Sequence, residues 1–298
     1  MHVRPFTTAA AAALLGLTLA LTGGSVSAAR TPAPGPYRLD APEVFAHRGA
    51  SAYAPENTLA AIDHAEALGV EWMENDVQRT KDGVLVVIHD ETLTRTTDVK
   101  RVFPGRSPWR VADFTAEEIS RLDAGSWFAP AFAGTRIPTL REYLARLDSN
   151  QERLLLEIKL PERYPGIERE TVQLLDEAGW LDERHVGRRL VVQSFSAASI
   201  RAVHALRPDL TTAFLGTPTT AELASYAAFT DRINPWYGGI DADWVAAVHG
   251  LRGPHGRRMQ VDAWTVDSAA AAQRVRDLGV DGIISNKPDV VRDAVGGF

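Results

Sequence analysis

Short apolar runs rich in β-branched residues alternate with helix-patterned stretches along most of this chain. A strand that alternates with a helix forms a βαβ unit, and a series of such units predicts a parallel sheet. About eight units in roughly 255 residues have the size of a closed TIM (β/α)8 barrel, so we expect an α/β chain of this architecture. The runs, in order, are EVFAH, VEWMENDVQ, VLVVIHD, RLLLEIKL, RLVVQSF, TTAFLG, DRINPWY, RMQVDAWTV and VDGIISN.

One stretch breaks the alternation. Residues 93–138 contain two turns rich in Gly and Pro, one predicted helix at 115–122 and several aromatic residues, among them Trp127 and Phe128. A segment of this length is too long for a simple loop, so we expect a small insertion after the second strand region, over one mouth of the barrel. Elsewhere the pattern predicts helices at 58–68, 140–147, 167–178, 197–206 and 267–278 and after Pro288.

The N-terminal segment has the layout of a secretory signal. Arg4 precedes an apolar stretch at residues 9–21, and Val26 and Ala28 occupy the small-residue cleavage positions. The alternative is an uncleaved membrane anchor, but the apolar stretch is too short and too rich in alanine to span a bilayer comfortably. We therefore expect a secreted protein with no stable membrane anchor. Its parts are a signal peptide at 1–28, a Pro-rich linker at 29–42 and a barrel domain at 43–298.

Composition narrows the function classes. The chain has 298 residues and no cysteine, which excludes disulfides and thiolate sites and leaves core burial to stabilise the fold. Loss of Arg4 with the signal lowers the count of Lys and Arg from 32 to 31 against 38 acidic residues, a net charge of −7. This acidic balance argues against a nucleic-acid partner.

Polar side chains stand where the predicted strands end. EVFAH ends in His47, and Arg48 follows it. VLVVIHD ends in His89 and Asp90. In a barrel, the C-terminal ends of the strands gather at one mouth, which is where barrel active sites lie. Gln193 and Trp264, late in their own runs, are expected at the same mouth. Gly49 is expected to let the backbone turn tightly beside a bound anion.

Charged pairs also interrupt two apolar runs. Alternate residues of a strand share a face, so Glu74 and Asp76 point the same way, as do Glu157 and Lys159. An unpaired charge in such a run would be costly to bury. Three carboxylates that converge at one mouth are most simply neutralised by a hard divalent cation such as Ca²⁺ or Mg²⁺.

This set of histidines, carboxylates and basic residues suits hydrolysis of a phosphate ester. His47 and His89 can act as general acid and base, and Arg48 and Lys159 can hold an anion. A cation on the phosphate and a histidine at each end of an in-line displacement complete the scheme. Taken singly, each residue also has a structural explanation, such as a core histidine or a salt bridge at the rim.

The successive motifs resemble those of the glycerophosphodiester phosphodiesterases. They are HRGASAYAPENTLAAIDHA, EWMENDVQRTKDGVLVVIHDETLTRTT, RIPTLREYL, LLLEIK, VVQSF, AWTVD and LGVDGIISNKP, in order over the whole chain after the signal. The resemblance implies a TIM barrel that hydrolyses glycerophosphodiesters to sn-glycerol 3-phosphate and an alcohol with one divalent metal ion. Its implied catalytic residues are His47 and His89, its metal ligands Glu74, Asp76 and Glu157, and its substrate-binding residues Arg48, Asn57, Lys159, Gln193 and Trp264.

Two positions depart from the family pattern. AWTVD has Asp267 where the family often has asparagine, and SNKP has Asn286 where a TD-x-P ending is usual. Neither position is itself a metal ligand or a catalytic histidine, so we expect the two departures to affect substrate contacts rather than activity. The motifs leave open which histidine is the acid. They also leave open whether the glycerol 2-hydroxyl attacks first, giving a cyclic phosphate, or water attacks directly.

Two alternative functions share this fold. A phospholipase D of the sphingomyelinase type resembles the same barrel, but those secreted enzymes rely on disulfides that a chain without cysteine cannot form. A non-catalytic binding barrel predicts that a ligand or histidine is replaced, and none is. Trp127 and Phe128 are hypothesised to form a wall on the alcohol side of the site, the alternative being that they pack the insertion. The preferred headgroup, the native metal, the oligomeric state and the physiological role stay open.

Overall fold

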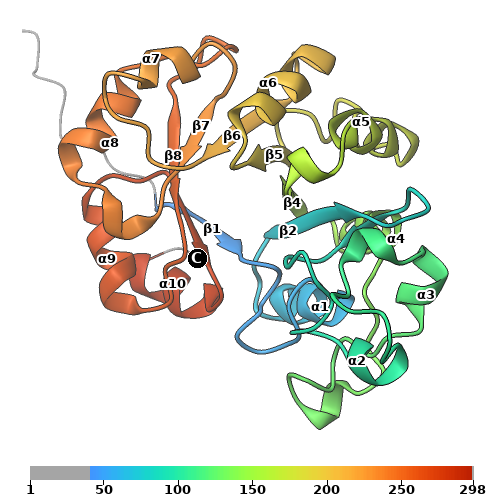
Figure 1. The fold of residues 1–298 in the computed structure, drawn as a ribbon. Coiled ribbons are helices and arrows are strands. Elements are labelled where there is room, and N and C mark those ends of the chain that lie inside the picture. The colour runs from blue at the N-terminus through green and yellow to red at the C-terminus, as the bar shows by residue number, and fades with distance from the viewer. Residues whose placement is uncertain (1–40, 297–298) are drawn as a thin grey trace, which may run out of the picture. The chain divides into compact units, whose positions relative to one another are not determined.

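The strands close into a barrel. The computed structural model describes residues 41–296, and eight parallel strands there pair in a ring that the contact between β1 and β2 closes. This confirms the predicted TIM barrel (Figure 1). The signal peptide, and all but the last two residues of the linker, lie outside the described residues. The barrel strands are β1 (Glu43–Ala46), β2 (Trp72–Arg79), β4 (Arg153–Ile158), β5 (Leu190–Ser194), β6 (Thr211–Leu215), β7 (Arg232–Asn234), β8 (Gln260–Ala263) and β9 (Gly282–Ser285).

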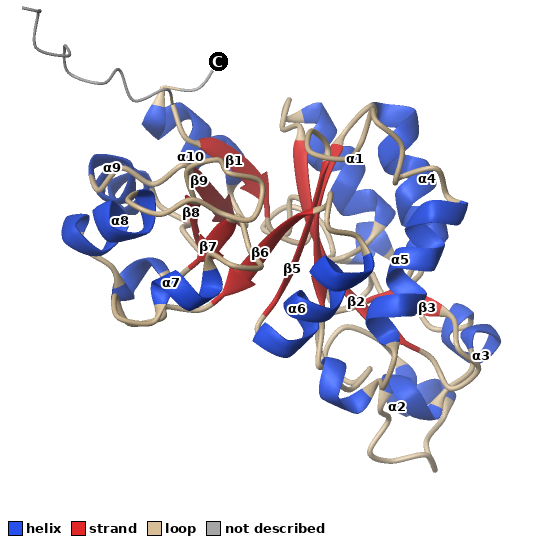
Figure 2. Ribbon diagram, turned by 90° about the horizontal axis from the view of Figure 1, so that it is seen from above, coloured by secondary structure: helices blue, strands red, loops and turns tan. Residues whose placement is uncertain are grey.

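Helices lie on both sides of the strands, as Figure 2 shows. The helices expected from the sequence form, with ends that differ by a few residues, while α7 and α8 lie in stretches where none was predicted. The helix α7 is a single turn, too short for a periodic pattern to reveal. The series is α1 (Leu59–Ala67), α4 (Leu140–Asn150), α5 (Ile167–Glu177), α6 (Ala197–Leu206), α7 (Leu223–Tyr226), α8 (Ala242–His249), α9 (Ala269–Asp277) and α10 (Pro288–Val295).

The run VLVVIHD does not form a strand of the barrel, contrary to the simple alternation read from the sequence. Its strand β3 (Leu85–Val87) pairs antiparallel with the end of β2, with Val87 opposite Val77. The chain therefore leaves the barrel along β2, turns, and returns toward the mouth. The amide of Ile88 donates to the Asp76 carbonyl at 2.9 Å, and this contact brings the following residue, His89, back to the rim.

The segment 93–138 has a small core of its own. It contains α2 (Val99–Val102) and α3 (Ala116–Ser120), and Thr115 caps α3 in a reciprocal capping box with Glu118. Leu93, Phe114 and Leu122 are fully buried in its core. The core also includes residues of the β3 stretch, so the insertion is anchored to the strand that delivers His89.

Side chains fill the barrel interior, so it is a packed core and not a channel. Phe45, Trp72 and Leu155 belong to an apolar layer inside the ring. Polar groups are added toward the C-terminal ends of the strands, where Glu74 and Asp76 follow Trp72 at alternate positions of β2. No helix in the range 41–296 is both long and apolar enough to cross a bilayer.

Candidate active site

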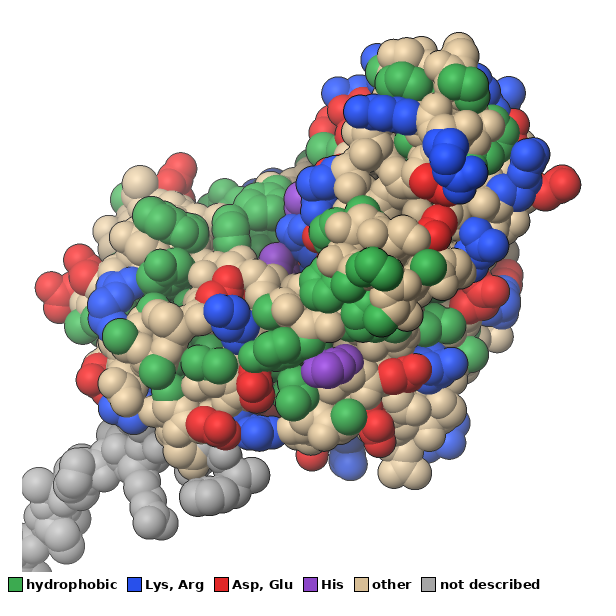
Figure 3. All heavy atoms as spheres, turned by 90° about the horizontal axis from the view of Figure 1, so that it is seen from below, with side chains coloured by type: hydrophobic (Ala, Val, Ile, Leu, Met, Phe, Trp, Pro, Cys, Tyr) green, Lys and Arg blue, Asp and Glu red, His purple; other side chains and the backbone are tan. Residues whose placement is uncertain are grey.

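A cavity opens at the C-terminal ends of the barrel strands. In Figure 3, histidine and basic side chains lie in a hollow of the surface, with hydrophobic side chains along one side. Its polar wall includes His47, Arg48, Glu74, His89, Glu157, Lys159 and Gln193. Its apolar wall includes Phe195, Leu215, Trp264 and Ile284. The cavity is therefore polar on one side and apolar on the other.

The turn after β1 aims two of these side chains. Arg48 and Gly49 both have positive φ, 57° and 78°, so the backbone reverses sharply after His47. A Cβ at Gly49 would lie 2.6 Å from the Cβ of Ala61 in α1, a distance that real side chains do not tolerate. Glycine is therefore required here by the tight turn and by the approach of helix α1, while an anion beside it stays a prediction.

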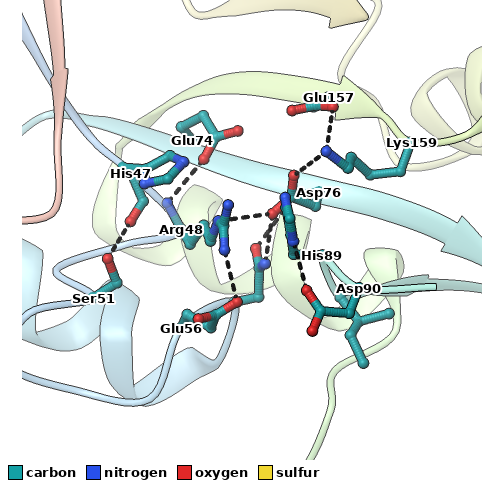
Figure 4. A network of polar contacts seen from close by, with 12 residues as sticks. His47, Arg48, Ser51, Glu56, Glu74, Asp76, His89, Asp90, Glu157 and Lys159 are labelled. Atoms are coloured by element: carbon teal, nitrogen blue, oxygen red, sulfur yellow. Dashed lines mark hydrogen bonds and ion pairs between the residues drawn. The ribbon is translucent and has the colours of Figure 1, made fainter. Parts of the chain in front are cut away.

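Three carboxylates converge on the floor of the cavity (Figure 4). Glu74 and Asp76 project from β2, Glu157 lies opposite Asp76 in register on β4, and all three are buried. One oxygen of each lies within 4.8 Å of the others. Burial and the two neighbouring carboxylates raise the pKa of Glu74 well above its usual range. Burial, followed by the charge of Asp76, raises the pKa of Glu157 to about 8.

Two cations offset this negative charge. Lys159 Nζ lies 2.7 Å from Glu157 Oε1 and 3.7 Å from Asp76 Oδ1, and Arg48 Nε lies 3.3 Å from Asp76 Oδ2. Burial opposes ionisation of Asp76, but Arg48 and Lys159 outweigh it and hold its pKa well below the usual range. Asp76 Oδ1 is buried and has no hydrogen-bond partner among the described residues. A buried set of carboxylates with an orphaned oxygen fits a hard divalent cation.

Amide side chains hold the carboxylates from behind. Asn57 donates from Nδ2 to Asp76 Oδ2 at 2.8 Å and accepts from the Asp76 amide at 3.2 Å. The sequence placed Asn57 on the cavity wall, whereas the structure places it behind Asp76. Gln193 donates to Glu74 Oε1 at 3.3 Å and is itself held by Asn234, which sequence reasoning missed. The carboxylates are thus fixed by side chains that point at them.

The two histidines have different partners. His47 Nδ1 lies 2.7 Å from Asn286 Oδ1, an amide oxygen, whereas His89 Nδ1 lies 2.7 Å from the carboxylate of Asp90. Burial and the nearby charge of Arg48 lower the pKa of His47 to about 4. Each ring uses Nδ1 to bond its partner, which leaves Nε2 for other contacts.

A chain of ion pairs links the two histidine loops, and it too was missed from the sequence. Arg95 donates to Asp90 at 2.6 Å and to Glu56 at 2.7 Å, and Glu56 accepts from Arg48 at 2.9 Å. Arg95 lies in DETLTRTT, at the end of the second family motif. A long-range carboxylate partner cannot be read from such a motif, because Glu56 is 39 residues away.

The aromatic residues of the insertion do not line the cavity. The Trp127 ring packs edge-on against Phe128, and the Arg95 guanidinium lies 5.9 Å from the Trp127 ring centroid. These contacts pack the rings within the insertion, and Trp127 also lies against Arg95, which donates to Asp90 beside His89. The aromatic wall is formed instead by Phe195, edge-on to Trp264 at 5.5 Å.

Comparison with known proteins assigns the family. The model of the glycerophosphoryl diester phosphodiesterase family matches residues 47–290, which begins at His47 and includes every residue of the polar wall. The chain belongs to this family. As a member it is an enzyme, a phosphoric diester hydrolase, in agreement with the motifs in the sequence.

Two bacterial relatives match over most of their length. A glycerophosphodiester phosphodiesterase of Caldanaerobacter subterraneus is 36% identical over 255 residues, 85% of this chain and 97% of the relative. One of Bacillus subtilis is 33% identical over 269 residues, 85% of this chain and 86% of the relative. Among solved structures, an Oleispira antarctica phosphodiesterase in complex with the product sn-glycerol-3-phosphate has a TM-score of 0.72 and 28% identity, covering 86% of this chain and 97% of that one.

Proposed function

We propose that this chain hydrolyses glycerophosphodiesters to sn-glycerol 3-phosphate and an alcohol, with one divalent cation, Ca²⁺ or Mg²⁺, and with His47 and His89 as the acid–base pair. The observation that carries the proposal is the buried triad of Glu74, Asp76 and Glu157 on the floor of a cavity that both histidines also line. The product in the Oleispira antarctica structure supports sn-glycerol 3-phosphate as the product here.

The charges of the site suit a phosphodiester. When bound by the triad, a divalent cation would neutralise the carboxylates and draw charge from the phosphate oxygens. Arg48 and Lys159, both on the cavity wall, would hold the remaining phosphate charge. The apolar wall of Phe195 and Trp264 would exclude water from the carbon chain of the substrate.

Proton transfer falls to the histidines. We expect the glycerol 2-hydroxyl to attack phosphorus, so that a new P–O bond forms while the bond to the alcohol breaks. One histidine takes the hydroxyl proton and the other protonates the departing alcohol oxygen. Water then opens the cyclic phosphate. Direct attack by water is the rival route, and phosphorus NMR of a reaction in progress distinguishes them, since only the first accumulates a cyclic phosphate.

The central experiment measures release of sn-glycerol 3-phosphate from choline, ethanolamine, glycerol and inositol diesters, with and without chelator. Full activity in chelator would remove the cation from the proposal. His47→Ala and His89→Ala should each lose most turnover while remaining folded. His204→Ala on helix α6, whose side chain does not line the cavity, is the matched control. Cleavage of sphingomyelin, with no action on the diesters, would instead favour the phospholipase D alternative.

Export is a separate part of the proposal. The layout of residues 1–28 supports a cleaved signal peptide. Expression of the full chain in a secreting host should yield a mature protein in the medium that begins at Ala29. A chain retained in the cells with Met1 in place would contradict this.

A further inference from the structure

The two positions that depart from the family pattern touch each other. Asp267 follows β8 and Asn286 follows β9, and Asn286 Nδ2 donates to Asp267 Oδ2 at 2.7 Å. The backbone amide of Asn286 donates to the other oxygen, Asp267 Oδ1, at 2.8 Å. A carboxylate only accepts hydrogen bonds, so it determines which way the amide faces. The nitrogen of Asn286 points at Asp267, and its oxygen points away.

That oxygen faces His47, so the expectation that the two departures affect only substrate contacts is wrong. Asn286 Oδ1 lies 2.7 Å from His47 Nδ1, and the Ser51 hydroxyl lies 2.7 Å from the same oxygen. An amide oxygen cannot donate, so His47 must carry its hydrogen on Nδ1 for this bond to form. In the neutral ring, Nε2 then bears the lone pair. Since the ring lines the cavity, Nε2 is the atom left for the substrate.

We propose that Asp267 and Asn286 act together as a positioning pair for His47, holding its ring in one orientation and in the neutral tautomer that accepts a proton at Nε2. The proposal rests on the proposed function in taking His47 as a reacting group. In the usual family pattern the same two side chains stand in the opposite order, which would put a carboxylate against the ring. Here the amide of Asn286 lies between the His47 ring and the Asp267 carboxylate. The ring is therefore oriented without a carboxylate in direct contact, which would favour the protonated imidazolium form.

The exchange of the two residues gives a direct test. Asn286→Asp alone sets two carboxylates against each other, and Asp267→Asn alone frees the amide to turn. Each single variant should lower kcat at least tenfold with KM changed less than twofold, because the substrate contacts remain. The double variant Asp267→Asn/Asn286→Asp restores one carboxylate and one amide in contact. It should recover most of the kcat lost by either single variant.

Asp289→Asn is the matched control, because Asp289 lies in the same region but accepts from the Tyr53 hydroxyl and has no bond to His47. It should retain wild-type kcat. Single variants that keep kcat within twofold of wild type would overturn the proposal. So would a double variant whose loss is the product of the two single losses, since independent sites behave in that way.

Nitrogen NMR of the His47 ring separates this proposal from the proposed function, because it requires no substrate. The wild-type enzyme should show a protonated Nδ1 and an unprotonated Nε2, and Asp267→Asn should give a mixture of tautomers. A wild-type ring protonated at Nε2 alone would overturn the positioning pair even if the enzyme hydrolyses diesters. The expected tautomer without any hydrolysis would leave the pair standing and overturn the proposed function.

Discussion

Replacement of Gly49 by alanine tests the packing that aims His47 and Arg48. The residue has a φ of +78°, and a side chain there would lie 2.6 Å from Ala61 Cβ and 2.8 Å from the Ala61 carbonyl carbon and oxygen. The left-handed backbone costs roughly 1–2 kcal/mol for a residue with a Cβ. Overpacking against a helix backbone adds about 1–3 kcal/mol. We expect Gly49→Ala to lower the free energy of unfolding by about 2–5 kcal/mol, the sum of these two costs.

The matched control is Gly83→Ala in the turn between β2 and β3. Gly83 has a φ of +88°, but a Cβ there would meet nothing within 4 Å, so only the backbone cost applies. Urea unfolding followed by tryptophan fluorescence gives the free energy of each variant by linear extrapolation. If the two variants are destabilised equally, to within about 0.5 kcal/mol, helix α1 does not constrain this turn and the reasoning is wrong.

Three further predictions concern other parts of the chain. Burial raises the pKa of Glu152 to about 8, and both its carboxylate oxygens are buried without a partner among the described residues. The folded state therefore binds more protons than the unfolded state between about pH 5 and 8, and stability falls as the pH rises through this window. Urea unfolding at pH 8 should give Glu152→Gln a free energy of unfolding about 1 kcal/mol or more above that of wild type, and at pH 5 the two should be similar. The same difference at pH 5 and pH 8 would contradict this. Arg95→Leu should lower kcat about tenfold with little change in melting temperature, because Asp90 loses the partner that holds it against His89. Steady-state kinetics measures kcat and calorimetry the melting temperature. An unchanged kcat would show that Arg95 does not act on His89 through Asp90. A divalent cation at a hundred times its Kd should raise the unfolding free energy by about 2.7 kcal/mol. Glu74→Gln should abolish most of that rise, as measured by thermal unfolding with and without chelator, and an equal rise in the variant would exclude Glu74 as a ligand.

Local patterns in the sequence were sufficient for the architecture and for much of the site. The alternation of strands and helices predicted the barrel, because each βαβ unit is specified by short-range periodicity. Spacing of two within a strand predicted that Glu74 and Asp76 share a face, and they do. The rule that strand ends meet at one mouth brought His47, Glu157 and Gln193 to the cavity without knowledge of any contact.

Antiparallel β3 could not be foreseen in this way, because a short apolar run looks the same whether it joins the barrel or folds back on its neighbour. The position of Asn57 behind Asp76 depends on a positive φ of 60° at Asn57. Asparagine tolerates this conformation better than most residues, but its surroundings decide whether it adopts it.

The sequence by itself determined the barrel, the residue types at its mouth and the faces they share. Only the tertiary structure decided which of those residues hold one another. The bond of His47 to Asn286 joins positions 239 residues apart, and Asp267 reaches the same amide from a third segment. Periodicity describes neighbours along the chain, whereas these contacts exist only because closing the barrel sets β1 beside β9 and β9 beside β8.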